Sequence, residues 1–187
     1  MNAILEKIKQ RRQLSLSAQL LAAAMACVMA VALPQICHLI GSAAGLGTSV
    51  GIALLPMHLP VLLVGLLAGP VAGAAAGALS PILSTLLTGM PLLLNLPLMI
   101  AELAVYGLVA GLLRSARIPT VLKVLAAQLC GRLVYLGATA IAILAFAREE
   151  LSIVAAFGSF KPGLLGIALQ LVLLPLLVFR LENAKKK

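Results

Sequence analysis

Hydrophobic residues form long continuous runs along this chain, and polar residues gather in a few short breaks between them. The stretch at 54–91, for example, contains no Lys, Arg, Asp or Glu. Runs of this kind are long enough for helices of roughly 20 residues, the length that crosses a bilayer. A membrane barrel would instead show alternating polar and apolar positions. The pattern predicts an all-α membrane protein, because lipid offers no partner to backbone groups outside a helix.

The breaks divide the chain into six predicted spanning helices within one integral membrane domain, 1–187. A basic segment at 1–13 is expected to lie at the inner membrane surface. The first run is longer than the apolar part of a usual signal peptide, so we predict a spanning helix there too. The six helices are expected at about 14–32, 52–67, 71–87, 92–113, 119–147 and 162–179.

Pro, Gly and Ser residues indicate where the connections between the predicted helices lie. The first helix is expected to stop near Pro34. The stretch at 35–51, which is rich in Gly and Ser, is predicted to form a long outer loop or a re-entrant segment between helices one and two. Tight turns are predicted at Gly69–Pro70, on the inner side, and within "TGMP", on the outer side.

Composition excludes a soluble globular protein. The chain is 63% hydrophobic and 10% charged, with a mean hydropathy of +1.16. Soluble domains are about half apolar and about a quarter charged. This chain would therefore present more apolar surface than a single soluble core could bury.

The net charge of +9 is explained by membrane topology and not by nucleic-acid binding, because the basic residues flank the hydrophobic runs. The positive-inside rule places both termini, including a basic tail at 181–187, in the cytoplasm, and an even number of spans follows. The break at 147–163 has balanced charges and is predicted outside. The basic clusters are Lys7, Lys9, Arg11 and Arg12; Arg114, Arg117 and Lys123; and Arg180 with Lys185, Lys186 and Lys187.

Polar residues recur at helical spacing on two of the predicted helices, at intervals of three or four. Glu102 and Arg132 both fall near mid-membrane, where a charge costs about 2.5 to 3.5 kcal/mol and normally pairs or serves function. We therefore predict an ion pair between Glu102 of helix four and Arg132 of helix five. The two stripes are Asn95, Met99, Glu102 and Tyr106 on helix four, and Gln128, Arg132, Tyr135 and Thr139 on helix five.

The predicted ion pair has two interpretations, and both are compatible with the sequence. It can be a structural strut that fixes the register of two helices, or part of a pocket for a small polar ligand. Further polar residues on the facing helices favour the pocket. The predicted substrate-binding residues are Asn95, Glu102, Arg132, Tyr135, Gln170 and His58.

His58 is expected near the outer interface, at the outer end of helix two, where water can replace a lost hydrogen bond. We therefore expect Arg132 to matter more for binding than His58. Even together with His38 it makes a weak metal site, because no carboxylate accompanies the two histidines. Cys27, Cys37 and Cys130 have no paired spacing and are interpreted as packing residues. No metal, cofactor or enzyme activity is predicted, since hydrolase, protease and nucleotide-binding motifs do not occur.

Small residues form stripes on the first three helices. Gly65, Gly69, Gly73 and Gly77 lie at intervals of four, and internal packing is the favoured interpretation for them. A second stripe runs along helix one, where another helix can approach closely. Its members are Ala18, Ala22, Ala26 and Ala30.

The order of these features resembles the substrate-binding S components of energy-coupling factor (ECF) vitamin transporters. The likeness includes the basic ends, the Ala-x-x-x-Ala first helix and the succession "MHLPVLLVGLLAGPVAGAAAGALSP…TGMP…AELAVYGLVAGLL". It extends over nearly the whole chain and is most specific from Pro56 to Leu113.

The resemblance implies a multi-pass protein of the prokaryotic plasma membrane that captures a vitamin or related micronutrient from the outer side. It implies a pocket formed mainly by helices four to six and capped by the first outer loop. The partners implied are a transmembrane T component and two cytoplasmic ATPases, with Ala22, Ala26 and Ala30 as the contact with the T component. Lipid surrounds the protein, and no nucleic acid is expected.

The resemblance leaves the substrate open, because one scaffold can bind chemically different vitamins. The chain has no Trp, two Tyr and four Phe, so extensive stacking on a large flat ring is disfavoured. A smaller molecule rich in hydrogen-bonding groups suits the predicted residues. Two alternatives remain: a stand-alone secondary carrier or channel, and a membrane-embedded enzyme.

Overall fold

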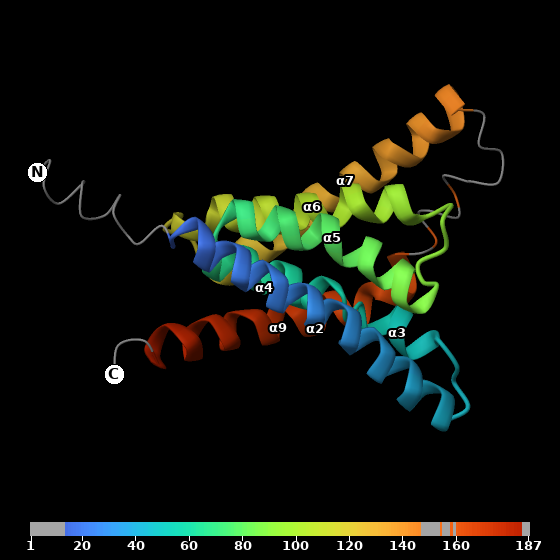
Figure 1. Ribbon diagram of the computed structural model, residues 1–187, viewed down its shortest axis with the longest axis horizontal. Helices are drawn as coiled ribbons and strands as arrows, with labels where there is room; N and C mark the ends of the chain where they lie inside the picture. The colour runs from blue at the N-terminus through green and yellow to red at the C-terminus, as the bar shows by residue number, and fades with distance from the viewer. Residues whose placement is uncertain (1–13, 147–153, 155–157, 159, 185–187) are drawn as a thin grey trace, which may run out of the picture.

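The computed structural model describes residues 14–146, 154, 158 and 160–184. In these residues every regular element is a helix (Figure 1). The predicted segment at 1–13, most of the break at 147–163 and Lys185 to Lys187 lie outside the described residues. The elements are α2 Leu16–Ala43, α3 Ser49–Leu54, α4 His58–Ala68, α5 Pro70–Thr88, α6 Leu96–Leu112, the 3-10 turn η1 Leu113–Ser115, α7 Thr120–Phe146 and α9 Phe160–Ala184.

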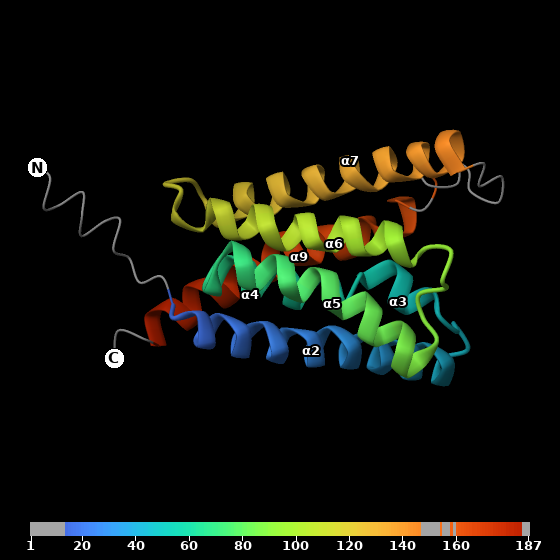
Figure 2. The same ribbon diagram turned by 45° about the horizontal axis from the view of Figure 1, so that its top comes forward.

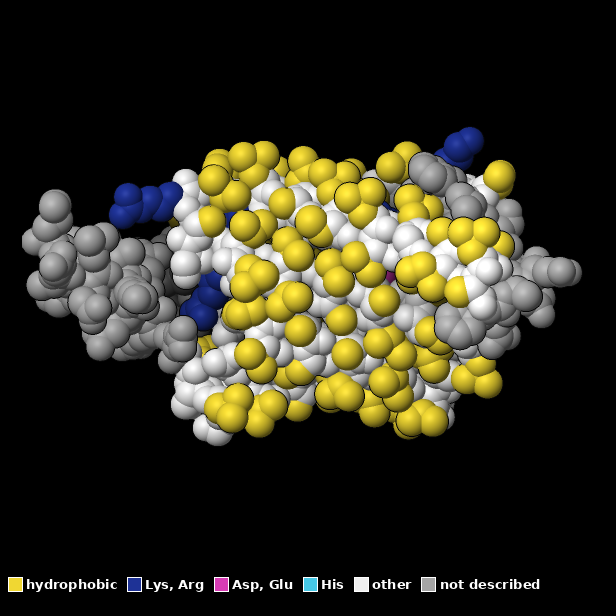
Figure 3. Space-filling model, turned by 90° about the horizontal axis from the view of Figure 1, so that it is seen from above, with side chains coloured by type: hydrophobic (Ala, Val, Ile, Leu, Met, Phe, Trp, Pro, Cys, Tyr) yellow, Lys and Arg dark blue, Asp and Glu magenta, His cyan; other side chains and the backbone are white. Residues whose placement is uncertain are grey.

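The all-helical membrane fold with six spans is confirmed. Six segments are long and apolar enough to cross a membrane, and α3 and α4 together make one of them. The start of α2 and the end of α9 lie at the same end of the bundle (Figures 1 and 2), as an even number of crossings requires. Apolar side chains cover the middle of the surface in Figure 3, and most of the visible Lys and Arg side chains lie toward its ends.

The predicted end of the first helix at Ala32 is wrong, because α2 continues through Pro34 to Ala43. Pro34 cannot donate to the carbonyl of Ala30, yet both residues are buried. Prolines are tolerated inside membrane helices because neighbouring packing compensates for the lost bond. Most of the stretch predicted as a loop at 35–51 is therefore helical, and the connection to α3 is only 44–48.

The second span is discontinuous instead of one helix over 52–67. Between α3 and α4 lie Leu55 to Met57, and Leu55 has a left-handed backbone conformation with φ 48°. The residue before a proline is sterically disfavoured in the α region, and Pro56 follows Leu55. Pro56 also lacks the N–H that a continuous helix would use. Both effects end α3 at this point.

Glycines bring the backbones of α5 and α6 into contact. A Cβ on Gly73 would meet the backbone of Gly107, and a Cβ on Gly107 would meet the backbone of Gly73. Gly77 faces the backbone of Leu103 in the same way, and Gly65 of α4 faces the carbonyl of Gly107. Internal packing by these glycines is therefore confirmed. Gly69 instead makes the turn between α4 and α5, with φ 116°.

The remaining helices agree with the predictions in their spans and differ at some ends. α5 and α7 begin and end within about one residue of the predicted limits. α6 starts at Leu96 and not at 92, because the chain turns first. α9 is longer than predicted at both ends and contains Pro175. At the end of the bundle where α2 starts, Lys123 Nζ donates to the carbonyl of Arg114 at 2.9 Å.

The glycine contact generates a prediction about folding stability. Gly107→Ala should destabilise the protein by about 1 to 3 kcal/mol, because its methyl group would collide with the backbone of α5. Gly137→Ala, in the interior of α7, meets nothing within 4 Å and should be neutral or stabilising by up to about 1 kcal/mol. Thermal unfolding in detergent measures both. Equal stability of the two variants would contradict the close approach.

Candidate functional site

A cavity of about 360 Å³ lies among α2, α3, the break before α4, α5, α6 and α7. It borders α3, at the end of the bundle opposite to the start of α2 (Figure 1). Much of its wall is apolar, including Pro34, Leu55 and Met99. The polar residues in the described wall are Gln35, His38, His58, Ser84, Asn95, Glu102, Arg132 and Tyr135.

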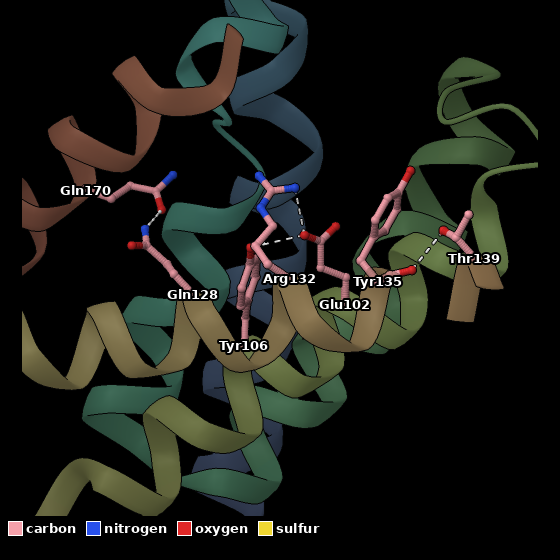
Figure 4. A network of polar contacts seen from close by, with 7 residues as sticks. All are labelled: Glu102, Tyr106, Gln128, Arg132, Tyr135, Thr139 and Gln170. Atoms are coloured by element: carbon pink, nitrogen blue, oxygen red, sulfur yellow. Dashed lines mark hydrogen bonds and ion pairs between the residues drawn. The ribbon is translucent and has the colours of Figure 1, made fainter. Parts of the chain in front are cut away.

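The predicted ion pair between α6 and α7 is confirmed. Arg132 Nη1 lies 2.9 Å from Glu102 Oε1, and the side chains are 15% and 3% exposed. The hydroxyl of Tyr106, one turn further along α6, donates to the same oxygen at 3.1 Å. Figure 4 shows these contacts converging on Glu102. Two donors therefore hold a buried carboxylate in the cavity wall, which satisfies the requirement that a charge at this depth be paired.

Asn95 and Tyr135 also line the cavity, as predicted from the stripes of α6 and α7. Thr139 belongs to the stripe of α7, but its hydroxyl donates to the carbonyl of Tyr135 at 2.8 Å (Figure 4). This bond within the helix satisfies Thr139 locally. Five of the six predicted binding residues therefore border one space: His58, Asn95, Glu102, Arg132 and Tyr135.

Gln170, the sixth, is not in the described wall of the cavity and is 1% exposed. Its Nε2 donates to the carbonyl of Leu55 at 3.1 Å, and its Oε1 accepts from Gln128 Nε2 at 3.0 Å (Figure 4). A partly buried carbonyl at a helix break needs partners beyond the regular helical bonds. Gln170 thus links α7 and α9 to the break that forms part of the wall.

His58 lies deeper than predicted. It is 5% exposed, so the expectation that it sits at a wet interface is wrong. The reason is the helix break, which makes His58 the first residue of α4 and sets its ring against Tyr106, with ring centroids 5.2 Å apart and planes tilted by 56°. Among the described residues neither ring nitrogen has a hydrogen-bond partner.

His38 borders the same cavity from α2, and its ring packs where a Cβ on Gly51 would lie. The described residues contain no group of three or more His, Cys, Asp or Glu side chains placed to hold a metal ion. Cys27 is buried, Cys37 is half-buried and Cys130 is exposed, and all three are free thiols.

The alanine stripe of α2 faces this chain's own interior. Ala26 is 6% exposed and Ala30 is fully buried, and Ala22 is half-buried at the edge of the same packing. Ala26 packs with Ala72 and Ala76 of α5 in one apolar cluster. The burial favours internal packing for Ala26 and Ala30, and contact with a T component stays a prediction.

The sequence reasoning missed two polar residues of the wall, Gln35 and Ser84. Gln35 fell in the stretch predicted as a loop. The signal that could have found it is the apolar spacing that continues after Pro34 through Ile36, Leu39 and Ile40, which is compatible with an uninterrupted helix. Ser84 follows Ser80 at the helical interval of four on α5.

Comparison with known proteins assigns a family over most of the chain. The model of the family described as "ECF transporter, substrate-specific component" matches residues 18–178. No match was found among curated proteins or among solved structures.

The buried ion pair generates a prediction about stability. Arg132→Met should lower the free energy of unfolding by about 3 to 5 kcal/mol, because it leaves the carboxylate of Glu102 buried without its counter-charge. The double variant Arg132→Met with Glu102→Leu should recover most of this loss, less about 1 to 3 kcal/mol for the stranded hydroxyl of Tyr106. Thermal unfolding of the three proteins tests it. A double variant no more stable than Arg132→Met alone would show that the pair is not the cause.

Proposed function

The chain belongs to the substrate-specific components of ECF transporters, and on this premise we propose that its cavity captures a vitamin or related micronutrient. Delivery to the inside then requires a transmembrane T component and two cytoplasmic ATPases. The membrane is the prokaryotic plasma membrane. The observation that carries the proposal is a cavity of about 360 Å³ whose wall contains a buried ion pair and further polar side chains.

The position of the cavity supports capture from the outer side. It borders α3, whereas Arg114 and Lys123 interact at the opposite end of the bundle, where α2 also starts. Under the positive-inside rule this basic end faces the cytoplasm. The cavity then lies toward the outer leaflet.

The size and chemistry of the cavity support a small polar substrate. Its volume falls at the lower end of the roughly 300 to 1,000 Å³ that small-molecule pockets occupy. Tyr135 and two histidines are the aromatic rings in its described wall, which gives little surface for stacking a large flat ring. We propose His58, Asn95, Glu102, Arg132 and Tyr135 as the residues that contact the substrate.

Uptake is the measurement that separates this function from its alternatives. Reconstituted alone in liposomes, the protein should bind a vitamin from a panel of water-soluble vitamins without accumulating it, because the chain contains no nucleotide-binding motif. Accumulation should appear when the T component, both ATPases and ATP are added.

The other outcomes of this experiment identify the alternatives. Uphill uptake by the single chain under an ion gradient would make it a secondary carrier. Dissipative flux in both directions would make it a channel, and turnover of a lipid substrate would make it an enzyme. Each of these results would overturn the proposed function.

Ala22 provides the test of coupling to the T component. Because Ala22 is only half-buried, Ala22→Leu should leave the fold intact but lift a partner helix away. We expect assembly with the T component to weaken by roughly tenfold or more, which corresponds to about 1 to 3 kcal/mol of overpacking. Co-purification of the complex and vitamin binding by the isolated subunit are measured together.

The matched control is Ala24→Leu, an exposed position on another face of α2. It should assemble as the wild type does. Ala26→Leu is unsuitable as a probe, because its bulk would disturb the protein's own core. Normal assembly of Ala22→Leu would remove this stripe from the proposed coupling surface.

A further inference from the structure

His58 is a buried polar side chain whose ring interacts with the backbone of Leu55 but makes no hydrogen bond of normal geometry among the described residues. It borders the cavity, is 5% exposed, and its Nδ1 and Nε2 make no hydrogen bond among the described residues. Two other buried side chains of this region differ from His58. Glu102 binds two donors, and Gln170 bonds through both ends of its amide.

An unsatisfied imidazole in this position calls for a partner from outside the chain. Buried polar groups in folded proteins are almost always hydrogen-bonded, and an unmade bond is unfavourable. Both nitrogens are covered in this conformation, so a substrate reaches them when the ring turns toward the cavity that it already borders. His58 directly follows the non-helical residues Leu55 to Met57, which form part of the cavity wall.

The charges of the wall indicate what kind of group His58 receives. Glu102 and Arg132 are the charged side chains in the described wall, and they pair with each other at 2.9 Å. Because the pair carries no net charge, an ionised substrate group would lose its hydration without gaining a net counter-charge from the described wall. A hydroxyl or carboxamide, in contrast, offers both a donor and an acceptor to a neutral imidazole, which is itself one of each.

We propose that His58 determines substrate specificity by hydrogen bonding to an uncharged hydroxyl or carboxamide group of the substrate. This inference rests on the proposed function. It assigns to His58 the recognition of one uncharged chemical group, in addition to the contacts proposed for the ion pair and the other residues of the wall.

Replacement of His58 with residues of chosen hydrogen-bonding capacity tests the inference. His58→Phe keeps a ring against Tyr106 but has no polar atoms, and His58→Gln restores one donor and one acceptor. The matched control is His38→Phe, the same substitution at the other histidine of the cavity. Thermal unfolding and binding are measured with nicotinamide and nicotinate, panthenol and pantothenate, biotinamide and biotin, and with thiamine, riboflavin and pyridoxine.

Without any vitamin, His58→Phe should unfold at the same temperature as the wild type or at a higher one, because it buries no unsatisfied nitrogen. For the probes that stabilise the wild type, His58→Phe should lose roughly tenfold to hundredfold in affinity. His58→Gln should recover part of that loss, and His38→Phe should lose less than His58→Phe. For each matched pair of vitamin derivatives that binds, the amide or alcohol should bind more tightly than the corresponding carboxylate.

The contrary results are distinct from a failure of the proposed function. Lower unfolding temperature of His58→Phe without any vitamin would show that His58 has a structural partner, and would overturn the inference. So would wild-type affinity in His58→Phe, or preference for the carboxylate. If none of the probes stabilises the wild type, vitamin capture fails, and the unfolding comparison alone decides the role of His58.

Discussion

Backbone contact between α5 and α6 is the constraint on which the rest of the structure depends. In lipid there is no hydrophobic force between helices, so close packing at small residues determines which helices associate. Gly73 and Gly107 make that approach, and Gly65 brings α4 against the same part of α6. The three helices form one tightly packed unit, and α6 presents Glu102 from it to the cavity. Helix α7 then meets this unit through Arg132.

The sequence predicted the parts of this arrangement that depend on periodicity. The helical interval placed Glu102 and Arg132 on stripes that face each other, because a charge in mid-membrane has few alternatives to an opposite charge. The spacing of Gly73 and Gly77 likewise predicted internal packing, and the number of spans followed from the lengths of the apolar runs.

The parts that could not be predicted depend on whether a proline interrupts its helix, which differs between two prolines of this chain. Pro34 and Pro56 each remove one backbone donor, yet α2 continues through the first and the second span breaks before the other. The difference lies in tertiary surroundings: Pro34 is buried within a continuous helix, and the carbonyl of Leu55 is bonded by Gln170 from a distant part of the chain. The burial of His58 depends on that break, so the sequence analysis wrongly predicted a water-accessible position for this side chain. Because the break was not predicted, Gln170 was assigned to the cavity wall, whereas its side chain bonds the carbonyl of Leu55 at the break.

The burial of the Glu102–Arg132 pair also affects how the protein responds to dissolved ions. Counter-ions screen exposed charges within about 10 Å at 0.1 M salt, but they act much less on buried pairs. With Glu102 3% exposed and Arg132 15% exposed, the attraction that joins α6 to α7 is shielded from the surrounding electrolyte. Exposed Arg117, in the connection between η1 and α7, has no such protection. The ion pair in the cavity wall therefore depends less on salt concentration than the interactions at the basic end of the bundle, which weaken as ionic strength rises.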